Sequence, residues 1–370
     1  MNRIVLVGNG FDLSLGLKTK YSDFLFYFFK SKLLKSLDAS KESLGRQYCG
    51  FYDGQLLKIL IGSYYSEHNV RTRIENVESL EELEGLKSLM KGHLRIEVKS
   101  MFLERIYESN RESGWVDIEQ IYFDLLIGCK NDSIDLTIEE LNREKENLTL
   151  ELESYLEEAQ NVGLDYEKVT LKHKRIFLEP IKGEELNYTS SNTQIEPQTV
   201  YFVNFNYTST IANISKILSR EESYPKVLRN DIHGNLNSLE NPMIFGFGDE
   251  EHDYYGEIEK LNDNRYLDHI KSFDYLKTTN YKKLMQFLDS ANFQVYIYGH
   301  SCGLSDRIML KQIFEHIKCK SIKIFYHKRE NGGDDYRTKT QEISRHFSSK
   351  NVMRETIVSW ELSEELPQIS

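Results

Sequence analysis

Cysteine and proline are scarce in this chain of 370 residues. Its four cysteines are far apart in the sequence, and none has the Cys-x-x-Cys spacing: Cys49, Cys129, Cys302 and Cys319. The sequence therefore excludes an ordinary zinc ribbon and is typical of isolated thiols in a reducing compartment. The five prolines leave little room for a disordered linker.

The chain also lacks long apolar runs and dense blocks of lysine and arginine. No stretch comes near the roughly 18 uninterrupted apolar residues of a membrane span, and the first residues lack the pattern of a secretory signal. The net charge is −11, with acidic and basic residues mixed throughout. These absences argue against membrane binding and against non-specific nucleic-acid binding as the main activity. We expect a cytoplasmic protein.

The apolar residues that are present predict a folded α/β protein. Hydrophobic residues make up 39% of the chain and aromatic residues 12%, which is typical of a folded domain. An apolar run at residues 4–7 stops at Gly8-Asn9-Gly10, as a buried parallel strand does before a tight turn. Residues 21–37 carry aromatic side chains at helical spacing, and we expect this helix to pack on the first strand.

The rest of the chain falls into two parts. Residues 51–182 are dominated by helix formers, with few strand signals. After a polar stretch that ends near Pro197, short apolar runs alternate with helical patterns, which predicts parallel βαβ units. The predicted strands lie within residues 199–205, 226–234, 242–248, 294–300 and 321–327. We expect a parallel Rossmann-like sheet in a domain of residues 1–50 and 191–370, with a large helical insertion or cap at residues 51–190.

Glycine and polar residues gather where the predicted strands end. The segments concerned are Gly8-Asn9-Gly10, residues 204–208, His233-Gly234, residues 246–249 and Gly299-His300-Ser301. Each has a plain explanation as a turn or a helix cap. Because parallel α/β sheets bind ligands beyond the carboxyl ends of their strands, the coincidence of all five predicts a ligand cleft.

Five segments of the chain resemble the bacteriophage abortive-infection family AbiH. They are GNGFDLSLGLKTKYSDF near the start, WVDIE in the middle, FNYT, IHG, and GHSCGLSD near the end. The resemblance spans nearly the whole chain. It implies a role in phage defence by killing or arresting the infected cell, and it does not by itself state the chemistry.

The chain is also similar, more distantly, to sirtuin-type NAD-consuming domains. The matching residues occur in the same order: Gly8 and Gly10 in the first glycine turn, Gly16 eight residues after Gly8, Asn206 at the asparagine of Thr-x-Asn-x-Asp, His233-Gly234 at the His-Gly pair, and Gly299 with Ser301 at the late Gly-x-Ser. The resemblance implies a sirtuin-like domain that takes NAD as its substrate, with no permanent cofactor and no metal.

Several positions depart from the sirtuin pattern. Asp12 stands where sirtuins have serine, Lys18 replaces a proline, and Thr208 replaces the acid after the asparagine. The quartet of zinc-binding cysteines is missing as well. Lysine deacylation is therefore not expected, and cleavage of NAD to nicotinamide and ADP-ribose fits the pattern better.

The sirtuin resemblance implies roles for individual residues. Asn206 is expected to hydrogen-bond the ribose or the attacking water, and His233 to act as the general base. The dinucleotide is expected to contact two groups of residues: Gly8, Asn9, Gly10, Phe11, Asp12 and Gly16, and then Gly299, His300, Ser301 and Asp306. The N–H groups of the first glycine turn suit the pyrophosphate. Asp306 could instead cap the following helix or orient His300, and the cap is favoured.

Two other functions stay open at this stage. One is a sensor that binds a nucleotide without turning it over; the other is a hydrolase acting on another nucleotide or on nucleic acid. Carboxylates able to hold a metal for such a hydrolase are Asp12, Asp23, Glu119 and Asp249. An NAD-consuming enzyme must also be gated. We expect a phage component or homo-oligomerisation as the trigger, and the acidic helical insertion as the place of the gate.

Overall fold

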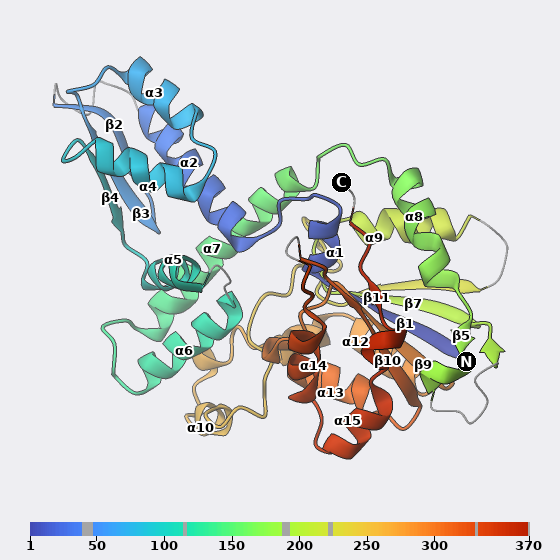
Figure 1. Cartoon of the computed structure of the whole chain (residues 1–370). Coiled ribbons are helices and arrows are strands. Elements are labelled where there is room, and N and C mark those ends of the chain that lie inside the picture. Colours follow the sequence, from blue (N-terminus) through green and yellow to red (C-terminus); the bar gives the residue numbers. More distant parts are fainter. Residues whose placement is uncertain (39–46, 114–116, 187–192, 221–224, 330–331, 369–370) are drawn as a thin grey trace. The chain divides into compact units, whose positions relative to one another are not determined.

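The computed structural model describes residues 1–38, 47–113, 117–186, 193–220, 225–329 and 332–368. Contacts within the chain define two compact units (Figure 1). The first holds residues 1–18, 157–261 and 269–370, and the second holds residues 19–156 and 262–268. Trp115, Val116 and the predicted domain boundary at residue 190 lie outside the described residues.

The first unit is built on a six-stranded sheet with the strand order β11-β10-β9-β1-β7-β8 (Figure 1). Every neighbouring pair is parallel. The strands are β1 (Asn2–Val7), β7 (Thr199–Asn204), β8 (Lys226–Asp231), β9 (Phe293–Tyr298), β10 (Cys319–Tyr326) and β11 (Glu364–Glu365). All six residues of β1 are buried, as expected for a central strand of a parallel sheet. The predicted parallel, Rossmann-like α/β fold is confirmed.

Helices cover both faces of this sheet. On one face, Leu6 and Ile297 pack with side chains of α12 (Asn280–Leu288), α13 (Arg307–Phe314) and α14 (Tyr336–Ser344). On the other face, Val5 and Phe202 pack with side chains of α1 (Asn9–Ser14), α8 (Tyr166–Leu178) and α9 (Thr210–Leu218). The unit also contains α10 (Tyr255–Glu259), α11 (Lys271–Asp274), α15 (Lys350–Thr356), β5 (Ile181–Lys182) and β6 (Gln194–Ile195). Helices on both faces of a parallel sheet are typical of doubly wound α/β folds.

The strand predicted within residues 242–248 is wrong. The backbone there is irregular, and Phe247 makes only an isolated bridge to Ile270. A Cβ on Gly246 would lie 2.2 Å from the carbonyl oxygen of His269, so the segment runs against another loop. Ile244 and Phe247 are buried, which explains the apolar run. A short apolar run indicates burial and does not by itself select a strand.

The second unit combines helices with the antiparallel sheet β2-β3-β4, so the expectation of few strands in residues 51–182 is wrong. The strict alternation of β4, with Leu94 inward and Arg95 and Glu97 exposed, is the period of a strand. The elements are α2 (Tyr21–Leu37), β2 (Tyr48–Asp53), β3 (Leu57–Gly62), α3 (Glu67–Glu75), α4 (Leu80–Leu89), β4 (Leu94–Val98), α5 (Met101–Ser113), α6 (Ile118–Lys130) and α7 (Ile138–Ala159). Among the described residues no helix has the length and apolarity to cross a bilayer.

The boundaries of the two units differ from those expected. The second unit begins at Thr19, because α2 packs on β2, β3, α3 and α4. The prediction that this helix packs on the first strand is therefore wrong. Residues 157–186, expected in the insertion, belong to the first unit, because α8 packs on α9 and its Val169 and Phe177 enter the core of the sheet.

Candidate active site

The carboxyl ends of β1, β7, β8 and β9 bring most of the predicted site residues to one edge of the parallel sheet. Gly8 follows β1, Asn206 follows β7, His233 follows β8, and His300 follows β9. The side chains of Asn206, His233 and His300 are all buried. The edge is thus polar and shielded from bulk water, the setting in which electrostatic interactions are strong.

The glycines of the first turn allow two loops to come together. A Cβ on Gly8 would lie 2.5 Å from the Cα of His300, and one on Gly10 would lie 2.7 Å from the carbonyl oxygen of Gly299. The N–H of Gly8 donates to the carbonyl of Tyr298 (3.3 Å), and that of Gly10 to the carbonyl of Gly299 (2.8 Å). These two amides therefore hold the loop after β9. Contact of the turn with a pyrophosphate stays a prediction.

Gly16 has a different role from the other glycines of this motif. Its φ is +82°, and nothing lies within 4 Å of a Cβ placed on it. The N–H groups of Gly16 and Leu17 donate to the carbonyls of Leu13 and Asp12, which closes the C-terminus of α1. A left-handed glycine that ends a short helix needs no ligand to explain it.

Asn206 ties three strand ends together. Its Nδ2 donates to the carbonyl of Gly8 (3.1 Å), and its backbone N–H donates to Asn204 Oδ1 (3.1 Å). Asn204 Nδ2 in turn donates to Asp231 Oδ1 (2.9 Å) at the end of β8. Asn206 is therefore held in one orientation beside the glycine turn. A side chain that positions a reactant needs such a fixed orientation.

Asp12 is a buried carboxyl group in α1, next to the same strand ends. Thr208 Oγ1 donates to Asp12 Oδ2 (2.6 Å), while Oδ1 has no hydrogen-bond partner among the described residues. Burial raises the pKa of the Asp12 carboxyl to about 6, and the Thr208 hydroxyl offsets only part of this effect. At neutral pH the fold therefore holds an ionised carboxylate at a cost in stability.

Replacing Asp12 by asparagine should stabilise the protein at high pH. A group whose pKa is raised on folding favours the folded state below its unfolded pKa and opposes it once the pH exceeds its folded pKa. Relative to wild type, the Asp12→Asn variant should gain up to ~3 kcal/mol at pH 8 and little at pH 4. Urea unfolding of both proteins at the two pH values measures this difference. A gain that is the same at pH 4 and pH 8 would show that the ionised carboxylate is not its cause.

His233 forms a buried pair with Asp306. Its Nε2 lies 3.1 Å from Asp306 Oδ1 and 3.1 Å from the hydroxyl of Tyr275, and the backbone of Phe205 hydrogen-bonds the ring as well. Lys271, only 1% exposed, places its Nζ 2.8 Å from the same Asp306 oxygen. Asp306 is the residue before α13, at the N-cap position, but its side chain makes no capping hydrogen bond. The favoured role of Asp306 as a helix cap is therefore wrong.

His233, Asp306, Lys271, Tyr275 and His300 form one cluster. The protonation states of its titratable groups follow from burial and from charge. Burial, with help from the Lys271 ammonium, lowers the pKa of the His233 imidazole below its ordinary value. Burial alone would raise the pKa of Asp306, but Lys271 and the two histidines hold that pKa well below its usual range. At neutral pH, His233 is thus a neutral imidazole beside an ionised carboxylate. This is the state in which a histidine can accept a proton.

His300 lies on the other side of Asp306. Its Nδ1 accepts a hydrogen bond from the backbone N–H of Cys302 (2.9 Å), and its Nε2 is 3.7 Å from Asp306 Oδ2. Burial lowers the pKa of His300 to about 3, so the ring is neutral and its proton lies on Nε2, toward the carboxylate. Cys302 has a φ of +59°, and burial raises the pKa of its thiol to about 12. Ser301 is exposed between them. A nucleophilic role for Cys302 has no support here.

A cavity of about 200 Å³ adjoins the cluster. Asp306, which pairs with His233, and Tyr275 both line it. Gly248 and Ser305 complete the wall beside Asp306, and a Cβ on Gly248 would lie 2.4 Å from the carbonyl oxygen of Ser305. The site therefore combines a neutral histidine, a paired carboxylate and an adjacent cavity.

Comparison with known proteins identifies the family. The model of the family described as "Bacteriophage abortive infection AbiH" matches residues 4–328. The chain belongs to the AbiH family. No curated protein matches the chain. Family membership indicates a role in bacteriophage abortive infection.

The AbiH motifs lead to most of the cluster, but they miss two of its members. Lys271 and Tyr275 come from α11 and the turn that follows it, where no strand ends and no glycine motif marks the sequence. In the sequence KSFDYLK a lysine and a tyrosine look like surface residues of an irregular segment. Only the burial of Lys271 against Asp306 reveals the connection.

The carboxylates considered for a metal are divided between the two units of this AbiH protein, Asp12 and Asp249 in the first and Asp23 and Glu119 in the second. Asp249 pairs with Arg307 (3.2 Å), and Asp23 accepts from the backbone N–H of Lys20 (3.2 Å) at the start of α2. Glu119 lies in the first turn of α6. Within the described ranges, no group of three histidine, cysteine, aspartate or glutamate side chains is arranged to hold a metal ion.

Proposed function

We propose that this AbiH protein is a phage-defence effector that hydrolyses NAD to nicotinamide and ADP-ribose. The observation that carries the proposal is the buried pair of His233 and Asp306, 3.1 Å apart, at the carboxyl edge of a parallel sheet and beside a cavity. That edge is where α/β folds bind nucleotides. The order of the motifs and the kind of residue in each support NAD over other nucleotides.

The chemistry requires little from the protein besides placement and one base. The nicotinamide of NAD is already cationic, so the C–N bond to ribose breaks with its electron pair moving onto the ring nitrogen. Water bonds to the ribose carbon and gives its proton to His233. Asp306 Oδ1 lies 3.1 Å from Nε2 of the His233 ring, so its negative charge then stabilises the imidazolium. Lys271 and His300 keep Asp306 ionised and in place.

Asn206 is the second residue proposed to act in the reaction. Its side-chain amide is held by the bond to Gly8, and its backbone N–H by the bond to Asn204. It can therefore present a hydrogen-bonding group to the ribose or to the water without reorganising. The hydroxyl of Tyr275, 3.1 Å from His233 Nε2, occupies a position from which a water or a ribose hydroxyl could pass its proton to the ring.

Replacing His233 by alanine should lower nicotinamide release from NAD by roughly 100-fold or more, as expected for the loss of a general base. Purified protein would be incubated with NAD, and separately with NADP, with and without lysate from phage-infected cells, because a toxic activity needs a trigger. Free nicotinamide would be followed by chromatography. His316→Ala is a matched control, because His316 also lies beside a carboxylate, Asp289, at 3.4 Å, but outside the cluster.

Each outcome has a clear meaning. Undiminished release in a folded His233→Ala variant would refute the assignment of the base. A conservative His233→Gln variant, checked by circular dichroism, guards against a loss that comes from misfolding. A nucleotide-dependent rise in melting temperature with no release under any condition would instead favour the sensor.

A further inference from the structure

The cavity beside Asp306 is too small for a whole dinucleotide. Its volume is about 200 Å³, whereas sites that enclose a drug-sized ligand measure ~300–1,000 Å³. One aromatic ring with a small substituent fits this space. The cavity is therefore a site for one part of a larger ligand, and its lining decides which part.

One wall of the cavity is aromatic. The rings of Tyr275 and Tyr281 are stacked, with centroids 5.7 Å apart and planes at 18°. Tyr275 also stacks on His233, at 6.2 Å and 22°. The Tyr281 hydroxyl donates to Gln312 Oε1 (2.6 Å), which fixes the outer ring of the stack. Asp306 lines the same cavity, so a planar ligand ring beside this wall would lie next to the residue that pairs with His233.

The charge of the lining is negative. Two acidic residues, Glu250 and Asp306, line the cavity, and among the described residues that line it there is no lysine, arginine or histidine. Lys271 contacts Asp306 without being part of the lining. Because the Lys271 ammonium offsets the charge of Asp306, the negative charge of the lining comes mainly from Glu250. This charge favours a cation over a phosphate, and a cation beside tyrosine rings is stabilised further.

We propose that this cavity binds a flat, cationic heteroaromatic ring, the pyridinium of oxidised NAD, and thereby selects the glycosidic bond presented to His233. The inference rests on the proposed function. The ring loses its charge when the C–N bond breaks, because the bonding electron pair neutralises the ring nitrogen. The cavity then holds neutral nicotinamide more weakly than it held the pyridinium, which favours release of the product.

Binding of isolated rings to the full chain tests the inference without any need for turnover. The probes are the 1-methylnicotinamide cation and neutral nicotinamide, titrated calorimetrically or followed by NMR. The cation should bind about tenfold more tightly than the neutral ring. Tyr281→Leu should weaken binding of the cation about tenfold, and Glu250→Gln, a change at an exposed side chain, should reduce the preference for the cation. The control is Tyr64→Leu, since Tyr64 is 74% exposed and belongs to the other unit.

The outcomes separate this inference from the proposed function. Preference for the cation that Glu250→Gln reduces would support the cavity site, even if NAD were not cleaved under any condition and the proposed function fell. Nicotinamide release that depends on His233, together with equal affinity for both rings or an unchanged affinity in folded Tyr281→Leu, would overturn the cavity site and leave the proposed function standing.

Discussion

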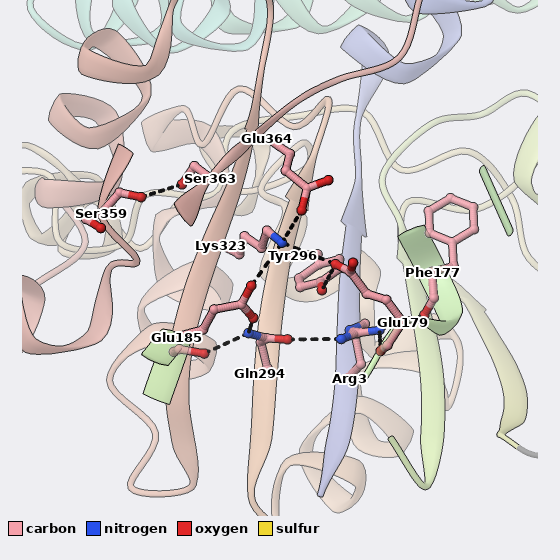
Figure 2. Close-up of polar contacts among 11 residues, drawn as sticks. Arg3, Phe177, Glu179, Glu185, Gln294, Tyr296, Lys323, Ser359, Ser363 and Glu364 are labelled. Carbon is pink, nitrogen blue, oxygen red and sulfur yellow. Dashed lines mark hydrogen bonds and ion pairs between the residues drawn. The ribbon is translucent and has the colours of Figure 1, made fainter. Parts of the chain in front are cut away.

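Replacing Lys323 by methionine should lower the free energy of unfolding by about 3–5 kcal/mol, the cost of leaving a buried charge without its partner. Lys323 lies on β10, and its side chain is 0% exposed. Its Nζ contacts three carboxylates: Glu185 at 3.0 Å, Glu179 at 3.2 Å and Glu364 at 2.7 Å (Figure 2). Glu185 is also buried, with 1% of its side chain exposed.

The cluster around Lys323 extends across three strands of the sheet (Figure 2). Gln294 on β9 donates to Glu185 Oε2 (2.8 Å) and accepts from Arg3 on β1 (3.2 Å). Tyr296, also on β9, donates to Glu179 Oε1 (2.7 Å). Burial alone would lower the pKa of the Lys323 ammonium, but the carboxylates raise that pKa above its ordinary value. The lysine is therefore charged at neutral pH, and removing it leaves Glu185 as an uncompensated buried anion.

Urea unfolding of the Lys323→Met variant measures the expected loss. Lys328→Met is the control. Lys328 is 57% exposed and its Nζ lies 3.7 Å from Glu365 Oε2, and such a surface ion pair contributes less than ~1 kcal/mol to stability. The double variant Lys323→Met, Glu185→Gln should recover part of the loss, since it also removes the stranded charge. Equal, small losses in both lysine variants would show that the cluster contributes no more than a surface ion pair.

The sequence predicted the parallel sheet, but it could not predict this cluster. The run around Lys323, SIKIFYH, indicates a strand because it is short and mostly apolar. A lysine inside such a run is ordinarily taken for the solvated side of a strand. Its burial depends on Glu179 and Glu185, which are more than 100 positions away in the chain and follow α8. Local periodicity carries no information on contacts at that separation.

The sequence also predicted some residues of the candidate site but not others. His233 and Asn206 follow strands and carry distinctive side chains, so the ends of the strands led to them. The role of Asp306 and the presence of Lys271 and Tyr275 were not predictable, because these residues meet only after α11 packs against the start of α13. The helix after the first strand was assigned to the wrong unit for a related reason: an aromatic helical face specifies burial, and it does not specify the sheet that buries it.

Replacing Gly299 by alanine should destabilise the protein by about 3 kcal/mol or more, through an unfavourable backbone and an overlap of atoms together. The φ of Gly299 is +76°, and a Cβ there would lie 2.1 Å from the backbone nitrogen of Phe11. Gly163→Ala is the matched control: its φ is +68° with nothing within 4 Å of the added carbon, so it should cost only ~1–2 kcal/mol. The difference between the two variants measures the close approach of the loops.

The same measurement on Gly10→Ala decides what the opening glycines of the chain are for. A Cβ on Gly10 would meet the carbonyl oxygen of Gly299 at 2.7 Å, the oxygen that accepts the N–H of Gly10 itself. If the turn serves the packing of the two loops, unfolding of Gly10→Ala without any nucleotide should show a loss of about 1–3 kcal/mol. If the glycine serves only the approach of a phosphate, nucleotide-free stability should match wild type while binding of NAD falls. A variant that loses both would show that the contact between the loops shapes the site that receives the dinucleotide.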